Sequence, residues 1–212
     1  MPTLSNDTIR NLLAPFRAPH NTDLPDSLID GVSTYLDLLI RWNARVSLTA
    51  IRHPEEIIQR HFGESLFTGA HLAQRLPGNA ELLDYGSGPG FPGLPIQMLL
   101  PNLRVTVAES QTRKVAFLRE VIRTLNLPAQ AWQKRVEEMP PDRQFDAVTL
   151  RAVEKMQFTL ENAKTRVRDG GWLAALVGQQ ADKTDAQEYR IPGSEHRRLL
   201  LWQIVPRGTI QS

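Results

Sequence analysis

The sequence predicts an α/β fold with a mainly parallel sheet, helices on both faces and a helical extension in front of it. Two observations predict this fold. In the C-terminal part of the 212-residue chain, short apolar segments alternate with amphipathic helical segments, a pattern typical of parallel sheets covered on both faces. Residues 1–75 show helical periodicity without a strand pattern. We therefore expect a helical extension over residues 1–75 and the sheet domain over residues 76–212.

Two amphipathic helices are predicted in the extension. Over residues 27–42 the apolar side chains recur at helical spacing, and residues 54–72 repeat this pattern with Pro54 suited to the first turn. His61 lies on the apolar side of the second helix, so we expect it to be a buried histidine rather than a functional one. Residues 75–79, which include proline and glycine, end the extension.

The sheet domain contains five clear strand patterns and three helical ones. The strands are predicted at residues 81–85, 103–108, 145–150, 172–177 and 199–205. The helices are predicted at residues 94–100, 112–126 and 154–168. Residues 130–132 are a candidate further strand between two of these elements. The alternation of strand and helix is that of a Rossmann-like sheet.

The composition excludes several functional classes. The chain has no cysteine, which excludes disulfides, thiolate zinc sites and a covalent cysteine nucleophile. Its five histidines show no paired ligand spacing, so no metal site is predicted. No secretory signal is present and no apolar stretch approaches the roughly 20 residues that span a bilayer. We expect a cytoplasmic monomer without membrane contact. With 25 basic and 23 acidic residues, the charge balance neither requires nor excludes nucleic acid.

A glycine-rich segment follows the first predicted strand. Gly88, Gly90 and Gly93 form a G-x-G-x-x-G pattern, the fingerprint of dinucleotide sites, where the backbone passes close to a ligand. A further G-x-G, formed by Gly86 and Gly88, precedes it, and three prolines in and after the loop remove amide donors that a pyrophosphate would need. The pattern alone is therefore a weak indication of a nicotinamide enzyme.

Two carboxylates favour a different cofactor. Asp84 lies at the end of the first strand, where it would repel a pyrophosphate and meet a cationic ligand group. Glu109 follows the second strand at the position that binds both ribose hydroxyls in this kind of fold. S-adenosylmethionine carries a ribose, an adenine and an ammonium group but no phosphate. The loop therefore favours S-adenosylmethionine over a nicotinamide dinucleotide and predicts a Rossmann-like class I methyltransferase.

These residues resemble the family of bacterial small-subunit (16S) ribosomal RNA guanine-N7 methyltransferases (RsmG, formerly glucose-inhibited division protein B). The resemblance extends from about Leu36 to about Leu201, and its most specific part is the loop from Leu83 to Pro95 with its P-G-x-P continuation. Further matches follow in order. They are Trp42-Asn43, Leu48-Thr49, Arg60-His61, Lys114, Phe117-Leu118, Arg135 to Glu138, Phe145-Asp146 and Arg151-Ala152.

The resemblance implies a set of cofactor-binding residues, to which the loop pattern adds Asp84. The implied residues are Gly86, Gly88, Gly90, Phe91, Glu109, Val136, Glu137 and Arg151. Three positions depart from the family pattern: Ser47 replaces an asparagine, Glu64 replaces an aspartate, and Val177 stands where the family usually carries a lysine. The last departure leaves open a cofactor-binding RNA module without catalysis.

Methyl transfer to N7 of guanine makes modest chemical demands. This nitrogen is an unprotonated acceptor, so no general base is predicted and no catalytic residue is assigned; orientation and electrostatics suffice. The expected partner is small-subunit ribosomal RNA, as naked RNA, a small ribosomal subunit or an assembly intermediate. The main alternative is a class I methyltransferase with a small-molecule or protein substrate.

RNA would be held by cations and stacking groups. The foremost candidates are Arg113, Lys114, Arg197 and Arg60, followed by Arg41, Arg45, Arg52 and Arg198, with Phe91 as a stacking surface.

Overall fold

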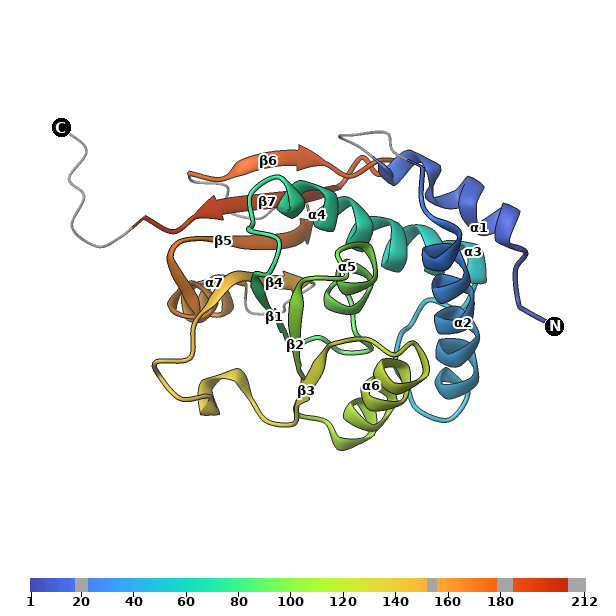
Figure 1. Ribbon diagram of the computed structural model, residues 1–212, viewed down its shortest axis with the longest axis horizontal. Helices are drawn as coiled ribbons and strands as arrows, with labels where there is room; N and C mark the ends of the chain where they lie inside the picture. The colour runs from blue at the N-terminus through green and yellow to red at the C-terminus, as the bar shows by residue number, and fades with distance from the viewer. Residues whose placement is uncertain (18–22, 152–155, 179–184, 206–212) are drawn as a thin grey trace.

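The structure is a computed structural model that describes residues 1–17, 23–151, 156–178 and 185–205, with the backbone alone at residues 156 and 157. Within these residues the chain forms one seven-stranded sheet in the order β3-β2-β1-β4-β5-β7-β6 (Figure 1). The strands are β1 Glu81–Tyr85, β2 Arg104–Ala108, β3 Gln130–Trp132, β4 Phe145–Arg151, β5 Val167–Gly178, β6 Gln187–Arg190 and β7 Arg197–Gln203. The predicted α/β fold is confirmed.

The sheet reverses its direction of growth at β1. Strands β1 to β5 are parallel, whereas β7 runs antiparallel to β5 and β6 antiparallel to β7. The chain builds outward from β1 through β2 to β3, and then returns to the other side of β1 for β4 and β5. In open α/β sheets, ligands bind at the carboxyl ends of the strands at such a switch point. The end of β1 and the end of β4 are therefore brought to one candidate site.

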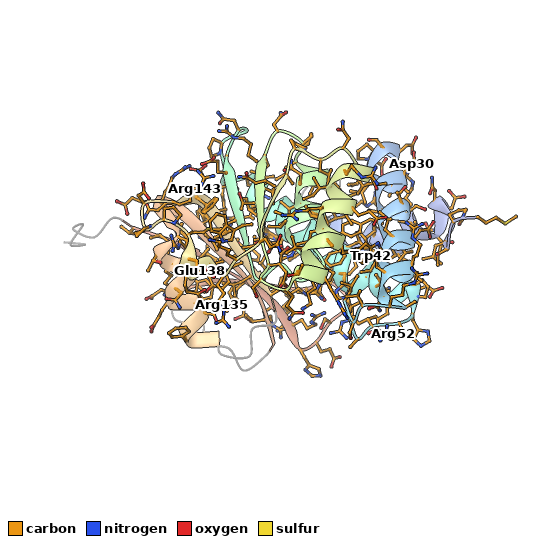
Figure 2. All side chains as sticks on the ribbon, turned by 90° about the horizontal axis from the view of Figure 1, so that it is seen from below. Asp30, Trp42, Arg52, Arg135, Glu138 and Arg143 are labelled. Carbon is orange, nitrogen blue, oxygen red and sulfur yellow. The ribbon has the colours of Figure 1, made fainter. Side chains whose placement is uncertain are left out.

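Helices cover the two faces of the sheet unequally. The helical elements are α1 Asn6–Leu13, η1 Ala14–Arg17, α2 Asp26–Asn43, α3 Pro54–Ile57, η2 Ile58–Gly63, α4 Glu64–Ala73, α5 Gly93–Leu99, α6 Thr112–Thr124, η3 Val136–Glu138 and α7 Met156–Thr165. Apolar side chains of α1, α2, α4, α5 and α6 share one buried core with one face of the sheet. The other face packs against α7 and the η3 segment. Figure 2 shows Arg135 and Glu138, at η3, on the opposite side of the molecule from Asp30 and Trp42 on α2.

The extension is part of the same hydrophobic core as the sheet. Leu36 and Leu39 of α2 are fully buried in the cluster that contains Leu82 of β1 and Val107 of β2. The division at residue 75 stays a prediction about domains, but the helices before it pack directly on the sheet domain. None of the helices that the structure describes is long and apolar enough to span a membrane.

The predicted helix over residues 54–72 is interrupted by a π-helical turn. The chain is α-helical in α3, π-helical in η2 and α-helical again in α4, without a break between the segments. Such π turns within α-helices are rare and frequently occur at functional sites. Here the turn carries Arg60 and His61.

The other predicted elements lie within a few residues of their positions in the structure, with four differences. Helix α1 was not among the two helices predicted for the extension. Strand β5 begins at Val167 rather than at 172, because Val167 already pairs with Phe145 of β4; the register then shifts and pairing resumes at Trp172. Strand β6, which is mostly exposed and lacks an alternating apolar pattern, was not predicted. Part of the helix predicted over 154–168 falls on residues outside the described ones.

Candidate active site

The glycine loop between β1 and α5 presents bare backbone to open space. Gly86 and Gly88 have φ angles of +67° and +57°, which favour glycine. A Cβ atom built on either residue would meet no other atom within 4 Å. The amide of Ser87 donates to the carbonyl of Ala108 (2.9 Å), which ties the loop to the end of β2. A ligand can therefore approach the backbone of this loop closely.

Gly90 is required for a different reason. Its φ is +95°, and a Cβ atom there would lie 2.2 Å from the hydroxyl oxygen of Tyr35. That hydroxyl, on α2, donates to the carbonyl of Pro89 at 2.5 Å. Tyr35 has no exposed surface. A side chain from the helical extension therefore fixes the far end of the loop, a contact that the sequence patterns did not indicate.

Asp84 lies beneath the loop and has no exposed surface. Its carboxylate accepts hydrogen bonds from the Ser87 hydroxyl, from the amide of Gly93 at 3.0 Å and from the Thr149 hydroxyl at 2.9 Å. Burial raises the pKa of this carboxyl, and the three hydrogen bonds act in the opposite direction. In this structure Asp84 shapes the loop from below, whereas the sequence suggested direct contact with a cationic ligand group.

Glu109 and the η3 segment lie at the ends of β2 and β3. The Glu109 side chain is largely buried, accepts from the amide of Gln111 at 2.8 Å and lies 3.9 Å from the ammonium group of Lys114. At the end of β3, Val136 is buried and the Glu137 carboxylate accepts a hydrogen bond from the Tyr85 hydroxyl (2.5 Å). These residues follow consecutive strands of the same sheet, where ribose and adenine contacts are expected.

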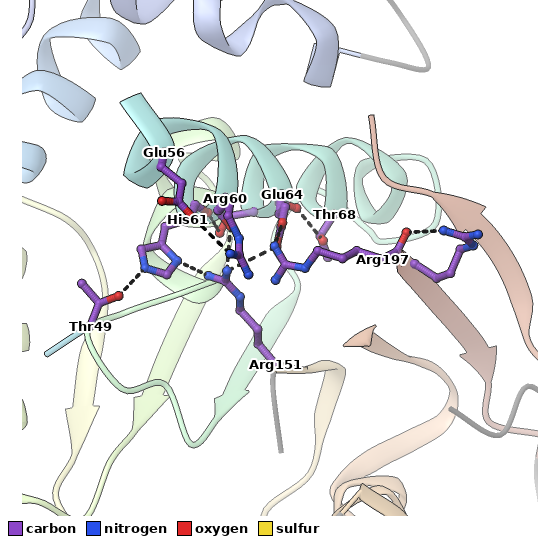
Figure 3. Close-up of polar contacts among 10 residues, drawn as sticks. Thr49, Glu56, Arg60, His61, Glu64, Thr68, Arg151 and Arg197 are labelled. Atoms are coloured by element: carbon purple, nitrogen blue, oxygen red, sulfur yellow. Dashed lines mark hydrogen bonds and ion pairs between the residues drawn. The ribbon is translucent and has the colours of Figure 1, made fainter. Parts of the chain in front are cut away.

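A polar cluster closes the site on the side of β4 (Figure 3). Arg151, the last residue of β4, donates to Nδ1 of His61 at 2.6 Å and to the carbonyl of Arg60 at 2.7 Å. Its guanidinium also lies 3.3 Å from the Glu64 carboxylate, whose other oxygen contacts Arg197 of β7. We call Arg60, His61, Glu64, Arg151 and Arg197 the arginine cluster. It joins the π turn to the ends of two strands.

His61 is neutral in this cluster. Burial, with Arg151, Arg60 and Arg197 adding to it, lowers its pKa from 6.5 to about 2. Because an arginine can only donate, Nδ1 of His61 accepts, so the ring proton is on Nε2 and points to the Thr49 hydroxyl at 2.8 Å. The expected buried histidine is confirmed, and its hydrogen bonds orient Arg151.

Phe91 is not available as an RNA-stacking surface. It is 4 % exposed and packs between Tyr35 and His61, with ring centroids 5.3 and 4.8 Å away. That prediction is wrong because the aromatic ring turns inward to anchor the loop on the extension. Phe91 nevertheless lines the small cavity beside the loop and keeps its candidate role at the cofactor.

The cations predicted to hold RNA have different surroundings. Arg113 is exposed at the start of α6, and Arg60 pairs with Glu56 at 3.1 Å on the surface. Arg41, Arg45 and Arg52 are exposed near the C-terminal end of α2. The prediction for Arg198 is wrong: its guanidinium is buried and donates to Glu188 (2.9 Å) and to two backbone carbonyls.

Val177 occupies a core position in β5. It is buried, belongs to the cluster on the α7 face and lies opposite Arg198 in the pairing with β7. Val177 and Arg197 are therefore on opposite faces of the sheet, because neighbouring residues of a strand alternate. Arg197, on the face of the extension, reaches the arginine cluster instead.

The residues around the loop fit S-adenosylmethionine. A cavity of about 280 Å³ is bordered by the loop glycines and by His61, Phe91 and Arg151. It combines bare loop backbone, an apolar ring and a guanidinium, while Glu109 lies at the neighbouring strand end. Ribose hydroxyls, a methionine carboxylate and an adenine ring find matching partners among these groups.

Comparisons with known proteins find similar sequences over most of the chain. A family profile described as rRNA small subunit methyltransferase G matches residues 29–198. The ribosomal RNA small subunit methyltransferase G of Desulfitobacterium hafniense is 38% identical over 168 residues, which cover 77% of this chain and 68% of that protein. The protein of the same name from Chromobacterium violaceum is 35% identical over 157 residues, covering 74% of this chain and 73% of that one.

Solved structures show the same fold at low sequence identity. A Thermus thermophilus 16S rRNA N2 G1207 methyltransferase, solved with AdoMet and guanosine, has a TM-score of 0.54 and 21% identity, covering 66% of this chain and 42% of its own. An RNA methyltransferase from Salinibacter ruber, solved with S-adenosyl-L-homocysteine, has a TM-score of 0.52 and 17% identity, covering 65% of this chain and 88% of its own.

Proposed function

Because this chain belongs to the rRNA small subunit methyltransferase G family, we propose that it transfers the methyl group of S-adenosylmethionine to N7 of a guanine in small-subunit ribosomal RNA. The observation that carries the proposal is the glycine loop at the switch point of the sheet, where Gly86 and Gly88 border open space. The family match spans this loop and the strands on both sides of it. We further propose that the protein acts as a cytoplasmic monomer.

The cofactor would be held by groups from consecutive strand ends. The backbone of Gly86, Gly88 and Gly90 would border its methionine part, and Glu109 would accept hydrogen bonds from the ribose. Val136 and Glu137, which follow β3, would line the adenine. Asp84 supports this arrangement from below, because its hydrogen bonds fix Ser87 and Gly93 in the loop.

The bound cofactor supplies an electrophilic methyl group on a sulfonium. Guanine N7 carries an available lone pair, so the chain's residues need only align the base and exclude water. The methylated base gains a positive charge, which a nearby cation would disfavour. His61 fits this requirement because it is neutral at physiological pH. Arg151 contacts Glu64 and His61, and the reaction requires no proton transfer from it.

A labelling experiment tests the function directly. Purified protein is incubated with methyl-labelled S-adenosylmethionine and small ribosomal subunits from a strain that lacks the gene, and N7-methylguanine is mapped by chemical cleavage. We expect label at one guanine, despite Val177. A Gly88→Leu variant serves as control, because a side chain there enters the open space beside the loop. Cofactor binding without label on subunits or naked RNA would overturn the proposed substrate.

A further inference from the structure

A second cleft, of about 370 Å³, adjoins the cavity at the glycine loop. Its walls come from η1, from the helical stretch that contains the π turn, and from the turn between β6 and β7. The cleft and the cavity share Arg60 and Arg197. The guanidinium groups of Arg60 and Arg197 therefore lie between the candidate cofactor cavity and this cleft.

Counting Glu56, the exposed partner of Arg60, the arginine cluster holds three guanidinium groups against two carboxylates, an excess of one positive charge. Asp84 also acts on Arg151, and its charge is counted with that of the cofactor. Arg60 pairs with Glu56, while Arg151 and Arg197 share the single carboxylate of Glu64. The Arg151 and Arg197 side chains are only 10 % and 23 % exposed, so water screens the excess charge poorly. The cluster can therefore accept one further anion.

The cofactor brings no net negative charge to the cluster, even where its methionine carboxylate meets Arg151. The amino-acid part of S-adenosylmethionine is zwitterionic and its sulfonium adds a positive charge, which the buried Asp84 carboxylate below the loop offsets. A phosphodiester, in contrast, carries one negative charge and two free oxygens that suit guanidinium forks. One RNA phosphate would thus neutralise the excess positive charge of the cluster.

The remaining walls of the cleft suit a nucleotide. Phe16 of η1 packs against Gly63, where a Cβ atom would lie 2.6 Å from the ring. Pro15 and Pro192 add apolar surface, and Gln59 and Ser194 add polar groups that can meet base edges. The volume falls within the roughly 300–1,000 Å³ range of small-molecule sites. Single-stranded RNA is commonly bound by such combinations of cations and apolar surfaces.

We infer that this cleft binds the nucleotide next to the target guanine, with the phosphodiester between the two held by Arg60 and Arg197. The inference rests on the proposed function. It assigns the β6–β7 turn and η1 to substrate binding, and it makes Arg60 and Arg197 substrate-binding residues. Glu64 is then a positioning residue, because its carboxylate orients Arg197 toward the boundary of the two spaces.

The test compares RNA binding and cofactor binding in three variants. Arg60→Gln removes a guanidinium whose ion pair is on the surface, so the fold should persist. Arg197→Lys keeps a charge beside Glu64 but loses the planar fork. The control is Arg104→Gln, an exposed arginine at the amino end of β2, whereas the site lies at the carboxyl ends of the parallel strands. Each variant is titrated with an unmodified small-subunit rRNA transcript at several salt concentrations, and separately with S-adenosylmethionine.

We expect Arg60→Gln to weaken RNA binding about tenfold and to reduce the slope of log K against log salt by about 0.7, the value for one phosphate contact on a single strand. Arg197→Lys should weaken RNA binding with an unchanged slope. Cofactor affinity should change less than RNA affinity in both variants, and Arg104→Gln should match the wild type.

Two results would overturn this inference and leave the proposed function in place. Wild-type RNA affinity and slope in Arg60→Gln and Arg197→Lys would place the phosphate elsewhere, and a loss of cofactor affinity without a loss of RNA affinity would assign the cluster to the cofactor. A wild-type protein that binds S-adenosylmethionine but neither binds the transcript nor labels small subunits would instead overturn the proposed function, and the subsite with it.

Discussion

Replacing Gly90 by alanine should destabilise the protein, and this loss should not add to the loss caused by replacing Tyr35 by phenylalanine. The alanine methyl would lie 2.2 Å from the Tyr35 hydroxyl at a φ of +95°. Backbone strain of about 1–3 kcal/mol and overpacking of about 1–3 kcal/mol together predict a loss of roughly 2–6 kcal/mol. Tyr35→Phe alone leaves the Pro89 carbonyl without its donor, at a cost of about 1–3 kcal/mol.

In the double variant the hydroxyl that overlaps the new methyl is absent. The next atom, Cδ1 of Leu94 at 2.8 Å, belongs to a flexible side chain. We therefore expect the double variant to lose about 1–3 kcal/mol less free energy of unfolding than the two single losses add up to, because the overpacking is relieved. Urea unfolding of the four proteins measures this coupling. Each kcal/mol should also shift the midpoint of thermal unfolding by about 2–4 °C for a chain of this size.

A matched control is available in the same loop. Gly88 also has a positive φ, but a Cβ atom there meets nothing within 4 Å. Gly88→Ala should show strain without overlap, and should show no coupling to Tyr35→Phe. Stability losses for Gly90→Ala and Tyr35→Phe that add within about 0.5 kcal/mol would refute the contact between the extension and the loop.

Three further outcomes are expected. Glu109→Ala should weaken S-adenosylmethionine binding by about 1.5–3 kcal/mol in calorimetry, and an unchanged dissociation constant would place the ribose elsewhere. Because the pKa of His61 falls from 6.5 to about 2 on folding, the unfolded state binds the extra proton between these values. His61 should thus lower the unfolding free energy below pH 6.5 by up to about 1.4 kcal/mol per pH unit, in addition to the contribution of His71, whose pKa falls to about 4. A His61→Gln variant with the full wild-type slope would contradict the reasoning. Glu64→Gln should lower the free energy of unfolding by about 3–5 kcal/mol, because it leaves the buried charge of Arg151 uncompensated. Glu56→Gln, at an exposed ion pair, should lower it by less than about 0.5 kcal/mol. Equal losses of the two variants in urea unfolding would contradict this difference.

The sequence predicted the elements whose local pattern and tertiary role agree. Strand β1 is a short apolar run buried on both faces of the sheet, and helix α6 has clear helical periodicity with burial on one side; the positions of both are confirmed. Strand β6 lies at an edge of the sheet and exposes much of its surface, so it carries no alternating pattern. The early start of β5 depends on pairing with β4 across Gly170 and Gly171, and such long-range register leaves little local trace.

The candidate site was predictable where a motif and a strand end coincide. The loop glycines and Glu109 lie at neighbouring strand ends, as the spacing indicated. The roles of Tyr35 and Glu64 were missed because each depends on partners far along the chain: Pro89 for the tyrosine, Arg151 and Arg197 for the glutamate. One signal was present for Glu64. It is a charged residue on the apolar side of a helix, one turn after Arg60.

The hydrogen bond between Tyr35 and Pro89 couples ligand binding at the glycine loop to the docking of α2. A ligand that binds the loop in its folded form also favours the docked position of α2, because the loop geometry includes the Tyr35 hydroxyl. By mass action, a hundredfold excess of cofactor over its dissociation constant adds about 2.7 kcal/mol to the folded state. Amide hydrogens of α2, far from the cofactor in sequence, should then exchange more slowly when the cofactor is present, and the extension becomes a reporter of cofactor occupancy.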